Sequence, residues 1–218
     1  MDLPLSNSRR MPVEEFDTRI ALSNAAKQAR QRGYHNFPII DVDSHHIEYE
    51  HLADILNYMD DPVLRQLIEA SIISGYRGVG AIPGALGYQD YGGRVMREPL
   101  RRLEQTDPTP HRDITLTRRW MDSLGVDIAI LFPTPMLHLG MHPQVDIEIA
   151  LASAYNRWLV EKILADEPRI RTMLYLPFND PAATYRTVKE FIGKKGVVGF
   201  MVTSNRYRPV HHNDYMKT

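Results

Sequence analysis

Residues 38–48 place several metal-ligating side chains directly after an apolar entry, in the order PIIDVDSHHIE. Side chains alternate between the two faces of a β-strand, so Asp41, Asp43 and His45 are expected to share one face. Carboxylate oxygen and imidazole nitrogen are both ligands of zinc and similar divalent ions. The spacing therefore predicts a metal site held by Asp43 and His45. The alternative is a strand that ends in a polar loop, where the same residues serve only as turn residues.

Two further polar residues of this segment have less specific interpretations. His46 is expected on the opposite strand face from His45, which indicates a structural role. Glu48 could be a carboxylate that holds His45 in place, as carboxylates often do for metal-bound histidines. It could equally be a plain loop residue.

The composition limits the kinds of site and partner. Cysteine is absent, which excludes disulfides and thiolate metal sites and leaves His, Asp and Glu as ligands. The formal net charge of −1 gives no general attraction to nucleic acid or membranes. With 218 residues, 43% hydrophobic and 24% charged, the chain is expected to form one globular domain. We find no signal-peptide pattern and no apolar run near the roughly 20 residues of a membrane span, so we expect a cytoplasmic protein.

Strand-like and helix-like segments alternate through the chain after the first strand. Such alternation with apolar strands is typical of a parallel α/β fold, whose active site lies at the carboxyl ends of the strands. Polar residues follow each predicted strand, which supports a site at that end: Asp43, His45, His138, Asn179 and Asn205. The later predicted elements are a helix over 113–124, a strand over 126–132, a helix over 145–166, a strand over 170–178, a helix from Asp180 to Gly193 and a strand over 197–203.

Two regions lie outside this alternation. Helical spacing over 14–32, closed by Gly33, predicts an N-terminal helical extension over 1–36, with an oligomer arm as the alternative role. Residues 50–112 form a long insertion that contains a glycine-rich segment, 74–93. Its glycines match no phosphate-binding motif, so a mobile loop or lid is the preferred interpretation.

Four segments in this order resemble the amidohydrolase superfamily of metal-dependent (β/α)8 barrels: IIDVDSHHIE, WMDSLGVDIAILFPTP, AYNRWLVEKILADEPRIRTMLYLPFNDP and GVVGFMVTSNRYRP. The branch that contains aminocarboxymuconate-semialdehyde decarboxylase is the most similar. The resemblance covers most of 37–218. It implies that these residues are parallel (β/α) units forming the first half of a TIM-like barrel, truncated after strand four, because such barrels typically need about 250 residues.

The resemblance also implies a metal, and it shows two departures from the family pattern. The bound ion would be divalent, zinc or manganese, with Asp43 and His45 as ligands. The family's strand-one signature is His-x-His or a variant with an acidic first residue, and here the first ligand would be a carboxylate, Asp43. The family's later ligands, a histidine after strand five and an aspartate at strand eight, would lie beyond Thr218, as would the catalytic base.

The function implied is a metal-dependent hydrolase or decarboxylase acting on a small carboxylated, possibly aromatic, substrate, with the 218-residue chain inactive on its own. The candidates for substrate binding are His138, Asn205, Arg206 and Arg208. A guanidinium can bind a carboxylate through two hydrogen bonds, and a solvated loop is the alternative for each arginine. The alternative function is a non-catalytic barrel fragment or a half-barrel module that associates with another copy through its sheet edges, giving a homo-oligomer.

Overall fold

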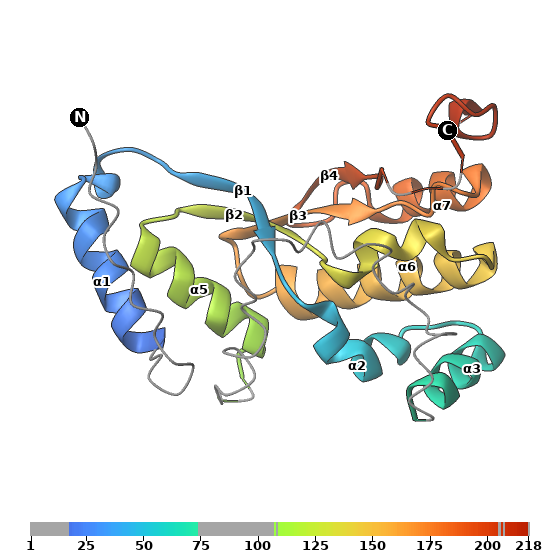
Figure 1. Cartoon of the computed structure of the whole chain (residues 1–218), viewed down its shortest axis with the longest axis horizontal. Coiled ribbons are helices and arrows are strands. Elements are labelled where there is room, and N and C mark those ends of the chain that lie inside the picture. The colour runs from blue at the N-terminus through green and yellow to red at the C-terminus, as the bar shows by residue number, and fades with distance from the viewer. Residues whose placement is uncertain (1–17, 74–106, 108, 205, 207, 218) are drawn as a thin grey trace, which may run out of the picture.

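The computed structural model describes residues 18–73, 107, 109–204, 206 and 208–217 (Figure 1). Its centre is a sheet of four strands in the order β1-β2-β3-β4, and each neighbouring pair is parallel. The predicted α/β fold with four parallel strands in sequence order is therefore confirmed. The strands are β1 (Ile40–His45), β2 (Ile128–Phe132), β3 (Ile170–Tyr175) and β4 (Val197–Met201).

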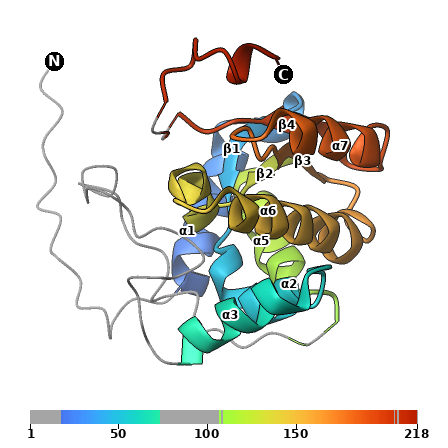
Figure 2. The same cartoon turned by 90° about the vertical axis from the view of Figure 1, so that its right-hand side faces the viewer.

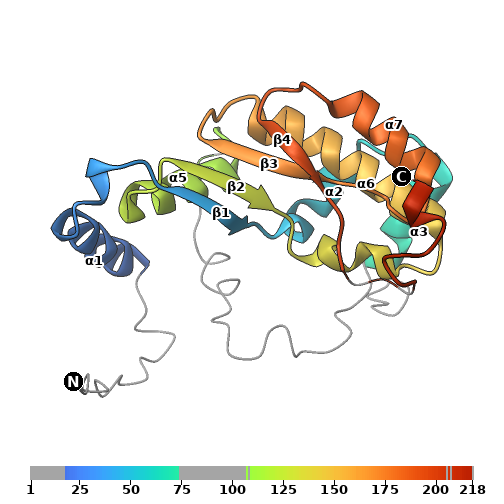
Figure 3. The ribbon, with the colours of Figure 1, turned by 90° about the horizontal axis from the view of Figure 1, so that it is seen from above.

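Helices connect successive strands, as parallel pairing requires. Helices α2, α3, α5 and α6 lie on one side of the sheet (Figures 1 and 3). Within the described residues, no helix is long and apolar enough to cross a bilayer. The helices are α1 (Thr18–Gln31), α2 (Leu52–Leu56), α3 (Pro62–Ile73), α5 (Arg112–Leu124), α6 (Val145–Leu159) and α7 (Pro181–Phe191), with shorter helical turns η2 (Tyr34–Asn36), η3 (Glu48–His51), η5 (Pro135–Met141), η6 (Val160–Leu164) and η7 (Tyr215–Lys217).

Local sequence signals explain where several helices begin and end. Helix α7 begins after Asp180, whose carboxylate accepts a hydrogen bond from the Ala183 amide at 2.5 Å, with Pro181 in the first turn. Helix α5 ends at Gly125, which has a left-handed φ of 74°. A Cβ at Gly125 would also lie only 3.2 Å from the Tyr34 Cβ, so a larger residue would be crowded as well as strained there.

The predicted boundaries need several corrections. The last three strands are shorter than expected, and the long helix over 145–166 is an α-helix that continues as a π-helical turn, η6. Helix α1 packs against α5, and Figure 2 shows it beside the main body. The proposed lid over 74–93 lies outside the described residues.

The two faces of the sheet differ sharply. The face toward α5 and α6 carries fully buried side chains such as Leu131 and Leu174, which join the core around Trp158. On the other face Ile40 is 52% exposed, and its strand partner Ile128 is only half-buried. No described element covers this second face, although parallel sheets are normally covered on both faces.

Candidate metal centre

A bulge in β1 decides which side chains point toward the uncovered face. Asp41 pairs with Ala129 and His45 pairs with Phe132, so β1 uses one more residue than β2 over the same distance. Because Ala129 points toward the helices, Asp41 shares that face, and it accepts a hydrogen bond from the Ser44 hydroxyl at 2.6 Å. The expectation that Asp41 shares a face with His45 is therefore wrong, since the bulge shifts the alternation by one position.

Asp43 and His45 converge on the uncovered face, as their spacing predicted. The His45 Nε2 lies 3.2 Å from the Asp43 Oδ1. The Asp43 side chain is 86% exposed and the His45 side chain 30%, so both are open to solvent. The His45 ring lies beside Phe132, with 6.0 Å between the ring centroids. The pair thus sits at the carboxyl end of β1, where parallel α/β folds place their sites.

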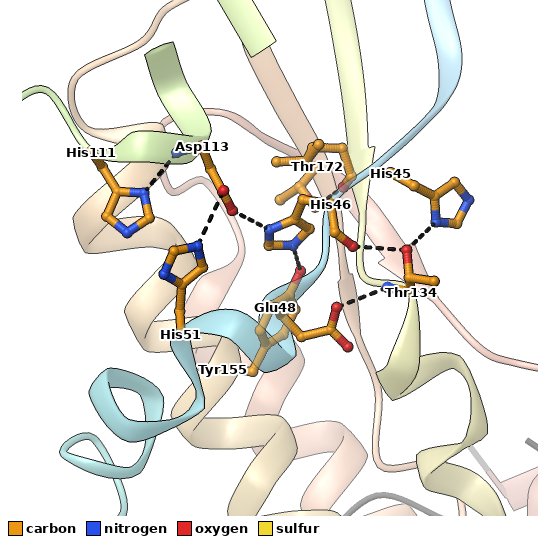
Figure 4. Close-up of polar contacts among 10 residues, drawn as sticks. His45, His46, Glu48, His51, His111, Asp113, Thr134, Tyr155 and Thr172 are labelled. Atoms are coloured by element: carbon orange, nitrogen blue, oxygen red, sulfur yellow. Dashed lines mark hydrogen bonds and ion pairs between the residues drawn. The ribbon is translucent and has the colours of Figure 1, made fainter. Parts of the chain in front are cut away.

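The hydrogen bonds of His45 define which ring nitrogen carries a proton. Its Nδ1 lies 3.0 Å from the Pro133 carbonyl oxygen and 3.4 Å from the Thr134 hydroxyl (Figure 4). That hydroxyl donates its own proton to the His46 carbonyl at 2.7 Å, so both neighbours of Nδ1 act as acceptors. The proton of a neutral His45 therefore belongs on Nδ1, which leaves a lone pair on Nε2.

This assignment leaves two lone pairs facing each other, one on His45 Nε2 and one on Asp43 Oδ1. A cation between them, either a second ring proton or a metal ion, would convert this repulsion into attraction. A backbone carbonyl on the other ring nitrogen is the usual outer partner of a metal-bound histidine. The two residues therefore fit a divalent cation, with one nitrogen and one oxygen ligand.

Glu48 fixes the turn that orients His45. Its carboxylate accepts hydrogen bonds from the Thr134 amide at 2.8 Å and from the Met136 amide at 2.5 Å. The side chain is fully buried, and this burial raises the pKa of Glu48. Pro133 and Thr134, which hold the His45 ring, belong to the same turn. The carboxylate therefore contacts the turn rather than His45 itself, and any effect of Glu48 on His45 passes through Pro133 and Thr134.

Behind the sheet, His46 belongs to a closed polar network. Its Nδ1 lies 2.9 Å from the Asp113 Oδ2, and its Nε2 lies 2.8 Å from the Tyr155 hydroxyl. The second oxygen of Asp113 lies 3.1 Å from the His51 Nε2 (Figure 4). Burial alone would raise the pKa of Asp113, but the hydrogen bonds from His46 and His51 outweigh it and hold that pKa well below its usual range.

A third histidine completes this group. His111 precedes α5, and its Nδ1 accepts a hydrogen bond from the Asp113 amide at 3.2 Å. Ligand atoms of His51, His111 and Asp113 all lie within 4.8 Å of one another, so the cluster could hold a metal ion. The sequence interpretation missed this cluster because its members come from separate segments. The one available signal was a His-x-Asp pair at a helix start.

The candidates for substrate binding come from the segments that follow β2 and β4. His138 is buried in η5, and Asn205 lies outside the described residues. Arg208 is exposed and donates to the Asp214 carboxylate at 2.7 Å. Arg206 follows β4, at the opposite edge of the sheet from β1. Their role in binding a substrate remains a prediction.

Arg206 is engaged inside the fold. Its side chain is only 5% exposed, and its Nη1 lies 3.4 Å from the Glu148 Oε1. Its guanidinium lies over the Phe178 and Tyr215 rings, at 5.4 and 5.6 Å from their centroids. Burial raises the pKa of Glu148, and the charge of Arg206 opposes that shift. The Glu148 carboxylate also accepts a hydrogen bond from the Tyr175 hydroxyl at 3.1 Å.

A cavity of about 600 Å³ lies away from the strand ends, among the helices. Its lining includes Arg157, which pairs with Asp60 and Glu190. None of the metal-site candidates lines it.

No family model matches this chain, and no curated protein matches it either. Function is therefore inferred from the residues and their geometry.

Proposed function

We propose that this chain supplies the metal-binding first strand of an amidohydrolase-type enzyme, a hydrolase or decarboxylase of small carboxylated, possibly aromatic, substrates. The metal would be zinc or manganese. The single observation that carries the proposal is the convergence of two lone pairs, on His45 Nε2 and Asp43 Oδ1, at 3.2 Å on a solvent-open strand end. The resemblance of residues 37–218 to that superfamily supplies the reaction class.

Each protein group has a defined part in this proposal. His45 and Asp43 would hold the metal, which when bound would polarise a substrate oxygen or activate water. Pro133 and Thr134 keep the proton on Nδ1, so that Nε2 stays available as a ligand. Two protein ligands leave most of the coordination to water, so we expect modest affinity. By the resemblance, the remaining ligands and the base belong to strands five and eight of the barrel, so we expect the four strands described here to be inert on their own.

The test is histidine-resolved NMR of the ring nitrogens during titration with zinc. We expect the His45 Nε2 resonance to move as zinc binds, because this nitrogen becomes a ligand. The movement should be lost in Asp43→Ala and kept in His211→Ala, a matched change at an exposed histidine. A His45 ring that does not respond to zinc would overturn the proposal. So would turnover of aromatic carboxylates, with zinc or manganese, that survives His45→Ala.

A second candidate function is a self-associating module, and the uncovered face of the sheet favours it. That face carries Ile40, which is half-exposed, and no described element covers it. Burying such apolar surface against another copy would be favourable. Size-exclusion chromatography with metal analysis separates the two candidates. A metal-free oligomer supports the self-associating module, whereas bound metal that is lost in His45→Ala supports the metal-binding strand.

A further inference from the structure

We propose that His51, His111 and Asp113 form a second divalent-cation site, separate from the His45–Asp43 pair, that takes zinc or a similar nitrogen-binding ion. The site would join η3 to the first turn of α5. It lies behind the sheet, whereas His45 lies on the uncovered face (Figure 4).

The three side chains already have the proximity that a metal requires. Their ligand atoms lie within 4.8 Å of one another, and no other trio of His, Asp or Glu in the described part of the chain meets that condition. The His51 and His111 rings are 4.6 Å apart between centroids. The set of two nitrogens and one oxygen suits zinc, with a fourth position left for water.

The hydrogen bond between His51 and Asp113 marks the place of the ion. One proton lies between the His51 Nε2 and the Asp113 Oδ1, 3.1 Å apart, and a metal ion would replace it. The other oxygen of Asp113 stays bound to His46 at 2.9 Å, and His46 is itself held by the Tyr155 hydroxyl. Asp113 therefore has the oriented outer partner that metal-binding carboxylates commonly have.

His111 also suits the role of a ligand. Its ring lies against that of His51, and its ligand atom is within reach of those of His51 and Asp113. Its Nδ1 accepts from the Asp113 amide, so coordination through Nε2 requires the ring proton to move to Nδ1 and the cap bond to break. This cost and the positive end of the α5 helix dipole together limit affinity. The negative charge of Asp113 offsets part of this loss of affinity.

Binding would have a mechanical consequence. His51 and the His111–Asp113 pair flank the long connection 52–110, so a shared ion would cross-link its two ends. Metal binding to preformed ligands stabilises the folded state, and closing a long loop adds to that gain. The readout is therefore thermal stability rather than activity.

The experiment uses two substitutions at the helix cap, His111→Ser and His111→Asp. Both residues are good N-caps, but only aspartate is also a zinc ligand. The full chain carries His45→Ala throughout, so the first site cannot contribute. Without metal, the two variants should unfold at similar temperatures. Zinc at about ten times the dissociation constant should raise the midpoint by roughly 3–6 °C in the parent and in His111→Asp.

His111→Ser should show no such rise. An equal rise in His111→Ser, or no rise in the parent, would overturn the second site. Because His45 is absent from these variants, that outcome leaves the first site untouched. Conversely, if the His45 resonance does not respond to zinc in the NMR titration, the thermal test of the second site still holds.

Discussion

His45, the last residue of β1, and His46, the residue that follows it, lie in opposite environments. His46 faces the helices with no exposed surface, and both of its ring nitrogens have partners, Asp113 and Tyr155. His45 faces the uncovered side of the sheet, with one ring nitrogen held by Pro133 and the other aimed at a carboxylate. The two residues are adjacent in sequence, yet they point to opposite sides of the sheet where β1 ends, one into a closed network and the other toward solvent.

The comparison shows how burial and hydrogen bonding divide structural from chemical roles. A buried polar group contributes stability only when each of its atoms has a partner, and the His46 network meets that condition. On the open side, the unsatisfied pair costs little because water can reach it, and it remains available to a cation. A histidine can therefore stabilise the fold on one face of the sheet, as His46 does, or present a ligand atom on the other, as His45 does.

The largest expected effect is the difference in the free energy of unfolding between His46→Ala and His45→Ala. His46→Ala should cost about 3–5 kcal/mol, because it leaves the buried Asp113 carboxylate without one of its partners. His45→Ala should cost about 1 kcal/mol or less, because the side chain is partly exposed. Urea unfolding of the two variants measures the difference. Equal losses would show that the two faces are energetically alike.

The second expectation concerns acid. Because the pKa of Asp113 is held well below its usual value of about 3.8, its contribution to stability is complete above that value. The contribution is lost as the pH falls from there toward the depressed pKa. Asp113→Asn should therefore show a weaker fall in the free energy of unfolding below pH 3.8 than the parent chain.

Asp43→Asn is the matched control for that measurement, because Asp43 is an exposed carboxylate on the other face. It should leave the acid dependence close to that of the parent. If both substitutions flatten the curve equally, the closed network is not the source of the acid sensitivity.

The smallest expected effect is at Thr134, which links the two faces. Its hydroxyl donates to the His46 carbonyl and lies 3.4 Å from the His45 Nδ1. Thr134→Val should cost only about 1 kcal/mol but weaken the preference for a proton on Nδ1. Ring-nitrogen NMR of His45 would detect that change. Thr187→Val removes a hydroxyl bonded to the Ala183 carbonyl in α7, and it should leave the His45 spectrum unaltered.

The structural features that depend on local sequence pattern could be predicted from the sequence. Apolar runs and helix periodicity predicted four parallel strands, and the Asp180–Pro181 pair marked the start of α7. The spacing of Asp43 and His45 predicted that their side chains converge. These features depend on neighbours within a few positions, so a period of two or 3.6 residues captures them.

The features that were missed depend on distant partners. The bulge that turns Asp41 toward the helices arises from pairing with β2, which the period of β1 does not reveal. Asp113 lies 67 positions from His46, and nothing local joins them. The structural role of Glu48 similarly rests on amides of the turn after β2. Such contacts are set by tertiary packing rather than by local sequence.

The buried pair of Glu148 and Arg206 has a consequence for the order of events during synthesis. Glu148 belongs to α6 and leaves the ribosome 58 positions before its counter-charge. Until Arg206 arrives, burying that carboxylate would leave an uncompensated charge in the core, which is strongly unfavourable. The first turn of α6 should therefore settle late, after β4 has joined the sheet. Proteolysis of stalled nascent chains would reveal the delay as cleavage near Glu148 that ceases once Arg206 has emerged.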